Sequence, residues 1–314
     1  MNKRVLSLTL LLACFSLVMQ AEGRIVEPFN SGWVFKKAPA GKELAVNAPK
    51  WESGWTEVEI PHTWNAKDMQ TQFYEGPAYY KKHYFFPAEL KDKRVFLRFE
   101  GVGAVAEVYV NGSLVTTHKG AYSAFSCEIG TALKPGADNE IIVKADNASR
   151  PDVIPINHVL FGVYGGMYRP VWLIVTDPYN ICVTDCASSG VYITQKNVSK
   201  KQADVKVKVK LDNGTLQPAP LTLQNTIYDQ EGKLVATQSR SFDLTPQGVQ
   251  SFEADFKIKN PTLWQGRKNP YLYKIVSRLI RNGIRDCCRR RILSEWREIS
   301  DVRRYPPSGL VGAG

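Results

Sequence analysis

Apolar and polar residues alternate in short runs along the first half of the chain. Runs of this kind that are rich in β-branched and aromatic residues fit β-strands. They lie at Tyr79–Phe86, Arg94–Phe99, Ala104–Val110, Leu114–Thr117, Glu140–Lys144 and Val171–Val175. Asn111-Gly112 separates two of them and predicts a hairpin, because both central residues of such a turn need φ > 0. The pattern predicts a β-sandwich over residues 22–178.

A second set of strands follows after Asp177-Pro178, which interrupts the alternation. These strands are expected at Val191–Thr194, Val205–Leu211, Leu221–Tyr228, Leu234–Thr237, Gln250–Ile258 and Tyr271–Ile280. Their number and spacing predict an immunoglobulin-like sandwich over residues 179–283. No stretch of the body carries a long, capped helical period, so we expect an all-β chain.

The stretch Phe161–Val175 combines a glycine pair with an arginine, a proline and an apolar strand. Gly165 and Gly166 let the backbone turn, or approach other groups, where a Cβ would clash. Pro170 fixes φ and leads into the strand, so the stretch is a rigid corner at a domain edge. Two interpretations stay open. One is a local turn in which Arg169 bonds carbonyl groups of its own sandwich, and the other is an edge that positions a functional site.

The first 21 residues have the layout of a secretory signal peptide. Lys3 and Arg4 precede an apolar run, Val5–Met19, and Ala21 stands before polar sequence. The apolar run is too short for a membrane span, so we expect export to the periplasm or the extracellular space and no transmembrane segment in the mature chain. A lipoprotein cleavage box ending at Cys14 is an alternative that stays open.

The formal net charge is +11. Two positive charges lie in the first 21 residues and a net three in the last 31, which leaves six for the body. Lys206, Lys208 and Lys210 alternate with valines, so this charge run is the solvated face of one strand. A nucleic-acid partner would need a basic patch with interleaved aromatic platforms, which the sequence lacks. We therefore expect no nucleic-acid binding.

The last 31 residues, 284–314, differ in composition from the rest of the chain. All 24 lysines lie before residue 284, whereas 7 of the 17 arginines lie after it. The strand alternation also stops at Asn282-Gly283, and no coherent element is expected beyond it. Our hypothesis is that the chain departs from its natural reading frame near Ile284. The alternative is an amphipathic helix from about Arg285 to Arg304.

Residues for catalysis or metal binding do not occur at the usual spacings. There is no nucleophile elbow, no phosphate-binding glycine loop and no His-Glu-x-x-His, and the four histidines are scattered. We expect no metal and no cofactor. Paired carboxylates for glycoside cleavage must converge across a sugar, and sequence spacing alone identifies no such pair.

Several residues on expected loops are of types that bind sugars, because flat rings pack on a pyranose and polar groups bond its hydroxyls. The candidates for substrate binding are Asp68, Tyr74, Asp152, Asn157 and His158. Structural and functional interpretations of these residues stay open. Trp51, Trp55 and Trp64 are assigned to packing, since tryptophan is highly buried on average.

Five motifs resemble, in this order, the N-terminal domain of glycoside hydrolase family 2, the β-galactosidase type. They are Asn30–Trp33 (NSGW), Ile60–Asn65 (IPHTWN), Tyr74–Lys82 (YEGPAYYKK), Val108–Gly112 (VYVNG) and Gly165–Val171 (GGMYRPV). The second sandwich resembles the immunoglobulin-like module of the family through Asn260–Trp264 (NPTLW) and Asn269–Tyr273 (NPYLY). Five motifs in one order are far more specific than any one of them.

The resemblance implies a galactose-binding-like jelly roll followed by an immunoglobulin-like sandwich. In the family a (β/α)₈ barrel follows, and two of its glutamates perform retaining hydrolysis. This chain stops where that barrel should begin. The resemblance therefore implies that the chain holds no catalytic residue and is inactive alone. The loops 68–76 and 152–158 are where the jelly roll would reach a β-galactoside-like glycan held by the missing barrel.

Two other functions stay open at this point. The jelly roll would serve as a lectin in a free-standing, secreted carbohydrate-binding protein. Alternatively, the sandwiches mainly present an interface to another domain. Sugar titration separates the first from a truncated glycosidase, and binding of a separately supplied barrel tests the second.

Overall fold

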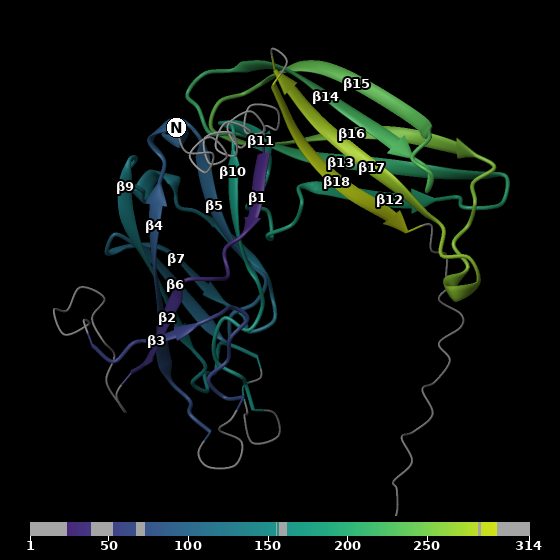
Figure 1. Cartoon of the computed structure of the whole chain (residues 1–314). Helices are drawn as coiled ribbons and strands as arrows, with labels where there is room; N and C mark the ends of the chain where they lie inside the picture. Colours follow the sequence, from purple (N-terminus) through teal and green to yellow (C-terminus); the bar gives the residue numbers. More distant parts are fainter. Residues whose placement is uncertain are drawn as a thin grey trace, which may run out of the picture.

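The computed structural model describes residues 24–38, 53–66, 73–154, 156 and 162–281, together with the backbone of 284–293. These residues form two β-sandwiches, the first coloured purple to teal and the second green to yellow in Figure 1. Helical structure in this part is limited to short 3-10 turns at Ala88–Leu90, Gly130–Ala132 and Gly266–Lys268. None of these is long or apolar enough to cross a membrane. The prediction of an all-β chain is confirmed.

The first sandwich contains ten strands in two antiparallel sheets. The strands are β1 (Arg24–Pro28), β2 (Trp33–Lys37), β3 (Thr56–Val58), β4 (Pro77–Phe86), β5 (Arg94–Phe99), β6 (Val105–Val110), β7 (Ser113–Lys119), β8 (Phe125–Glu128), β9 (Ala137–Asp146) and β10 (Val171–Thr176). One sheet has the order β1-β10-β5-β8 and the other β3-β2-β4-β9-β6-β7. The corner before β10 and the start of β5 therefore lie at opposite ends of one sheet, because these two strands run antiparallel.

The core of the first sandwich lies between the two sheets. Alternate residues of each strand face it, as the side-chain period of a strand requires. Phe99 of β5 stacks on Phe125 of β8 with ring centroids 4.7 Å apart, and Trp33 and Tyr80 reach the same cluster from the six-stranded sheet. Asn111 and Gly112 have φ of 50° and 80° between β6 and β7, so the predicted hairpin is confirmed.

The second sandwich is also built from antiparallel sheets. Its strands are β11 (Tyr179–Ile181), β12 (Val191–Lys196), β13 (Gln202–Asn213), β14 (Ala219–Tyr228), β15 (Leu234–Leu244), β16 (Gly248–Lys259), β17 (Leu272–Arg281) and β18 (Ile284–Leu293). β13 pairs with β11, β12 and β16, and the other sheet has the order β15-β14-β17-β18. Val207, Leu211 and Ile275 are among the residues of its own buried core.

Strand β18 changes the description of the chain beyond residue 283. It pairs antiparallel with β17, with Ile284 opposite Arg281, so strand pairing continues past the boundary expected there. The expectation of no coherent element is wrong for residues 284–293, and so is the alternative of a helix beginning at Arg285. The reason is that the free backbone groups along an edge strand pair with any extended segment, whatever its side chains.

The register of β18 nevertheless sets it apart from its partner. Arg290 stands opposite Ile275, and Asp286 stands opposite Leu279, and both of these β17 residues belong to the buried core. The hypothesis of a changed reading frame near Ile284 stays a prediction.

We predict that Leu97→Ala destabilises the first sandwich by about 2–5 kcal/mol, because it opens a cavity in a closely packed core. Leu97 is fully buried in the middle of β5. The matched control is Leu114→Ala on β7, which is exposed and should change the free energy of unfolding by no more than about 0.5 kcal/mol. Urea denaturation measures both, and equal effects would contradict the assigned core.

Candidate functional site

The Gly165-Gly166 corner lies directly against side chains of the first sandwich. A Cβ on Gly165 would stand 1.8 Å from Trp64 Cζ2. A Cβ on Gly166, whose φ is +119°, would stand 2.5 Å from Tyr80 Oη. Both distances are far inside van der Waals contact, so no other residue fits at either position without a backbone shift. The glycine pair brings the backbone as close to the aromatic core as it can lie.

Asn65 joins the corner to the neighbouring loop. Its Oδ1 accepts a hydrogen bond from Gly165 N at 2.8 Å, and its Nδ2 donates to Tyr74 O at 3.0 Å. The side chain is fully buried, where an amide needs partners at both ends. Asn65 therefore fixes the separation of two loops that are about a hundred residues apart along the chain.

Asn147, directly after β9, makes the corresponding contacts from the other side. Its Nδ2 donates to Val163 O at 2.8 Å and to Tyr74 O at 3.2 Å, and its Oδ1 accepts from Gly76 N at 2.9 Å. This side chain is also fully buried. Together Asn65 and Asn147 form what we call the amide network, which ties three loops to one end of the six-stranded sheet.

Aromatic residues behind the amide network are packed against one another. Trp64 stacks on Phe35 with ring centroids 5.8 Å apart, as its assignment to packing predicts. His62 Nδ1 lies 2.7 Å from Tyr80 Oη. Burial, and next the charge of Lys37, lower the pKa of His62, while burial raises the pKa of Tyr80. Both side chains are therefore neutral at physiological pH and support the corner.

Tyr74 is the first of the predicted substrate-binding residues that the structure places. Its hydroxyl donates to Pro77 O at 2.9 Å, and the ammonium of Lys37 lies 5.3 Å from its ring centroid. Burial raises the pKa of the Tyr74 hydroxyl. These contacts hold the Tyr74 hydroxyl inside the protein. Three further candidates, Asp68, Asn157 and His158, lie outside the described residues.

Asp152 lies on the surface between two cations. Its carboxylate oxygens contact Lys119 Nζ at 2.5 Å and Arg150 Nε at 3.1 Å. Hydrogen bonds from these two residues lower the pKa of Asp152 to about 2. A carboxylate of this kind stays ionised and is a poor proton donor at neutral pH, but it can accept hydrogen bonds from sugar hydroxyls.

Arg169 does not hold the corner in the way the sequence suggested. It is exposed and makes no hydrogen bond or ion pair with any residue that the structure describes. The carbonyl groups nearby are already satisfied by the backbone, since Glu100 N donates to Pro170 O and His62 N donates to Met167 O. The glycine contacts and the amide network therefore maintain the corner.

Three large side chains at the same end of the sandwich are exposed, and the sequence pattern does not single them out. Tyr122, Ile154 and Tyr164 are 65%, 78% and 43% exposed. Their neighbours in the chain, Ala121, Val153 and Val163, belong to one buried cluster, which brings the three segments together. We call these three exposed residues the loop-end patch. Of these three residues, only Tyr164 lies next to a feature that the sequence pattern marks, because it directly precedes the glycine pair.

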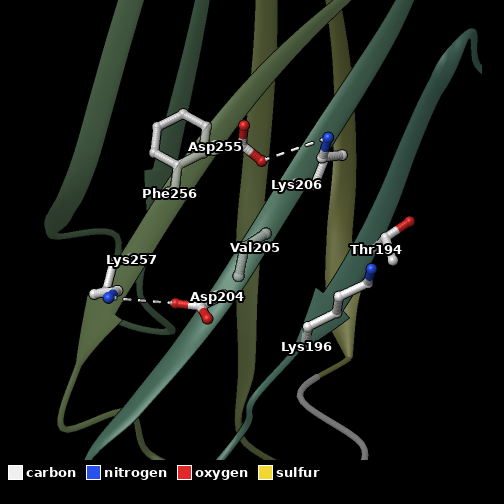
Figure 2. Close-up of a pocket in the computed structure, with 8 residues that line it drawn as sticks. All are labelled: Thr194, Lys196, Asp204, Val205, Lys206, Asp255, Phe256 and Lys257. Atoms are coloured by element: carbon white, nitrogen blue, oxygen red, sulfur yellow. Dashed lines mark ion pairs between the residues drawn. The ribbon is translucent and has the colours of Figure 1, made fainter.

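A pocket of about 580 Å³ lies on the second sandwich, along β12, β13 and β16. Figure 2 shows its lining, which consists of Thr194, Lys196, Asp204, Val205, Lys206, Asp255, Phe256 and Lys257. Cross-strand ion pairs join Lys206 to Asp255 at 3.8 Å and Lys257 to Asp204 at 3.9 Å. These charges satisfy one another on a solvated face, as the alternation around Lys206 predicts. The pocket is not a candidate site.

The loop end of the first sandwich thus offers aromatic rings, an ionised carboxylate and two cations on a rigid base. Such a surface can pack against the apolar face of a ligand and bond its polar groups. Among the described residues, no group of three or more histidine, cysteine or acidic side chains is placed to hold a metal ion. Binding, and not proton transfer, is the chemistry that these residues support.

Two consecutive β-sandwiches, the first with an aromatic loop end, place this chain in the class of all-β proteins built from more than one sandwich. Comparison with protein families is specific. The model for the sugar binding domain of glycosyl hydrolases family 2 matches residues 29–178, and a second model of glycosyl hydrolases family 2 matches residues 189–292. The chain belongs to glycosyl hydrolases family 2, and the recognition made from its five motifs is confirmed.

Relatives with curated names cover the same region. The chain is 33% identical over 290 residues to a beta-glucuronidase of Bacteroides fragilis, in an alignment that covers 90% of this chain and 39% of the relative. It is 28% identical over 263 residues to a beta-galactosidase of Thermoanaerobacter pseudethanolicus, which covers 82% of this chain and 33% of that protein. The chain therefore spans well under half the length of these relatives.

Solved structures agree with both sandwiches. A Bacteroides fragilis crystal structure assigned as a beta-galactosidase is 65% identical, with a TM-score of 0.83 over 86% of this chain and 41% of its own. A beta-glucuronidase of Bacteroides uniformis is 30% identical, with a TM-score of 0.80 over 86% of this chain and 32% of its own. The jelly-roll and immunoglobulin-like assignments are confirmed, and the described residues contain no (β/α)₈ barrel.

We predict that Gly165→Ala destabilises the first sandwich by about 1–3 kcal/mol or more, because the new methyl group overlaps the Trp64 ring. The matched control is Gly248→Ala, since a Cβ on Gly248 meets nothing within 4 Å. Thermal and urea unfolding compare the two variants. A Gly165→Ala variant as stable as the control would show that the corner has room to move.

The pKa of Asp152 gives a pH prediction. Because its folded-state value lies below that of an unfolded aspartate, its ion pairs are fully formed above about pH 4 and are lost as the pH falls towards 2. Carboxyl-carbon NMR should show a titration midpoint near 2, and Lys119→Met should raise it. Lys134→Met, a remote exposed lysine, should leave it unchanged; an equal shift there would contradict the assignment.

Proposed function

We propose that this chain is the N-terminal, non-catalytic portion of a β-galactosidase-like glycosidase, in which the loop end of the first sandwich borders a sugar site that a catalytic domain completes. The observation that carries this proposal is the loop-end patch of Tyr122, Ile154 and Tyr164. It lies on the domain whose family model is the sugar binding domain of a glycosidase family. The relatives are glycosidases more than twice as long, which supports a composite site.

The chemistry of the loop end fits a pyranose. Exposed tyrosine rings pack against the apolar face of a sugar while their hydroxyls stay solvated. Asp152, with Lys119 and Arg150 beside it, adds an ionised acceptor and two donors near the same surface. The amide network keeps the segment around Tyr164 in place, so little conformational entropy is lost when a ligand binds.

Relatives differ in the sugar that their names record. A Bacteroides fragilis relative is named a beta-glucuronidase, whereas a Bacteroides fragilis structure assigned as a beta-galactosidase has the higher identity to this chain, 65%. We therefore propose a β-galactoside-like glycan as the ligand class, with a β-glucuronide as the comparison. The proposal places hydrolysis on residues outside this chain.

A chimera tests the proposal. Residues 24–281 would replace the corresponding portion of the 65% identical Bacteroides fragilis protein, whose remaining domains are kept. We expect a folded chimera that hydrolyses a nitrophenyl β-galactoside, while the isolated chain gives no rate above blank. A folded but inert chimera, or hydrolysis by the isolated chain free of contaminating enzyme, would contradict the proposal.

Within an active chimera, Tyr164→Ala should raise KM by roughly 5- to 30-fold, because a ring that contacts the sugar contributes on the order of 1–2 kcal/mol. The control is Leu216→Ala, an exposed apolar residue of the second sandwich, which should leave KM unchanged. Equal kinetic constants for the two variants would remove Tyr164 from the site.

A lectin-like, free-standing binder is the second candidate, and the same exposed tyrosines favour it. NMR titration of the isolated chain with galactosides and plant-wall oligosaccharides separates the two. Half a site should bind only in the millimolar range or weaker, whereas micromolar binding would favour the lectin.

We further propose export, on the signal-like residues 1–21. A mature N-terminus at Glu22 supports it, an acylated Cys14 indicates the lipid-anchored form, and an intact cytoplasmic Met1 contradicts it.

A further inference from the structure

The two sandwiches meet at the end of the first sandwich that lies opposite the glycine corner. Figure 1 shows β1, β5 and β10 reaching this end, where β11 and β13 of the second sandwich begin or finish. One apolar cluster joins them, with Phe96 and Ile174 of the first sandwich, Val183 after β11, and Trp172 packed against these three. An interface of this kind allows relative movement unless something else restrains it.

Arg94, the first residue of β5, makes charged contacts with both sandwiches. Its Nε and Nη2 donate to the two carboxylate oxygens of Glu128 in its own sandwich, at 2.9 Å and 2.7 Å. Its Nη1 lies 2.9 Å from Asp212 Oδ2, at the end of β13 in the second sandwich. The side chains of Arg94 and Asp212 are only 15% and 11% exposed. The planar guanidinium thus binds one acid from each sandwich at the same time.

The acceptor from the second sandwich is held firmly. Asn213, next to Asp212, is fully buried and donates to the carbonyl groups of Gln217, Leu244 and Thr245. The following residue is Gly214, where a Cβ would stand 3.0 Å from Arg94 Cδ and Nε. The backbone of the second sandwich therefore lies directly against the arginine side chain, next to Asp212.

Other polar contacts near this end involve the segment after β10 and a backbone carbonyl group of β11. Lys93 pairs with Asp177, and Arg24 donates to the carbonyl group of Ile181 on β11. Burial by itself would lower the pKa of Arg94, but its hydrogen bonds to Glu128 and the charge of Asp212 raise it, so the guanidinium stays charged. If the arginine is lost, Asp212 is left as a largely buried, unpaired charge, which proteins tolerate poorly.

We propose that Arg94 is a latch that joins the two sandwiches into one cooperative unit and fixes the direction in which the second leaves the first. The inference rests on the contact geometry and does not depend on the proposed function. Within the described part of the chain, Arg94 is the one residue seen to pair with acids of both sandwiches.

Hydrogen exchange of the whole chain in low urea tests the latch. In the wild type, core amides of β4 and β13 should exchange with the same urea dependence, as parts of one unit. Arg94→Met should raise the opening constant of β13 on the order of 100-fold while β4 changes much less. Separate behaviour of β4 and β13 already in the wild type would overturn the proposal, as would equal changes in both strands of the variant.

Two controls distinguish the latch from a general loss of stability. Lys206→Met removes an exposed ion pair of the second sandwich and should change β13 exchange less than about 5-fold. Glu128→Gln removes the partner within the first sandwich and should leave the two sandwiches coupled. If Arg94→Met fails to fold, Asp212→Asn is measured instead, with the same expectation. Coupling retained in Asp212→Asn, or lost in Lys206→Met, would overturn the proposal.

Discussion

The approach of a glycine backbone to a tryptophan ring is the constraint on which the loop end of this protein depends. Gly165 lies where a single Cβ would overlap Trp64, and that ring is in turn stacked on Phe35 in the core. With the glycine backbone held against the ring, Gly165 N lies within hydrogen-bond distance of Asn65, and Val163 O lies within hydrogen-bond distance of Asn147. Two buried amides then satisfy three loops at once, which makes the loop end rigid without a metal, a disulfide or a helix among the described residues.

The two ends of the first sandwich differ in the side chains and contacts that they carry. At one end the glycine corner and amide network support exposed tyrosines and an ionised aspartate, which are suited to a sugar. At the other end Arg94 meets an acid of the second sandwich. β5 and β10 are adjacent, antiparallel strands that run between the two ends. The same sheet therefore carries the loop end and the contact with the second sandwich, and it sets the distance between them.

Predictions from the sequence succeeded where side-chain period and turn chemistry act locally. The alternation predicted both ends of the strand Arg94–Phe99 correctly, and Asn111-Gly112 predicted the hairpin. They failed for β18, because edge pairing depends on the backbone of a neighbouring strand and not on its own side-chain pattern. One of the two interpretations that the sequence left open has Arg169 bonding carbonyl groups of its own sandwich. Its carbonyl partners are in fact taken by backbone donors that are distant in sequence.

The sequence by itself determined the fold class, the two modules and the family, since strand periods, turn residues and five ordered motifs are all local features. It also identified Tyr74 and Asp152 as candidate site residues, but it did not determine their roles. Only the tertiary structure showed that the Tyr74 hydroxyl is engaged internally, that Asp152 is held by two cations, and that Tyr122, Ile154 and Tyr164 are exposed at one end. The glycine corner follows the same division. The glycine pair itself can be read from the sequence. The side chains that pack against it come from a segment about a hundred residues away, so only the tertiary structure identifies them.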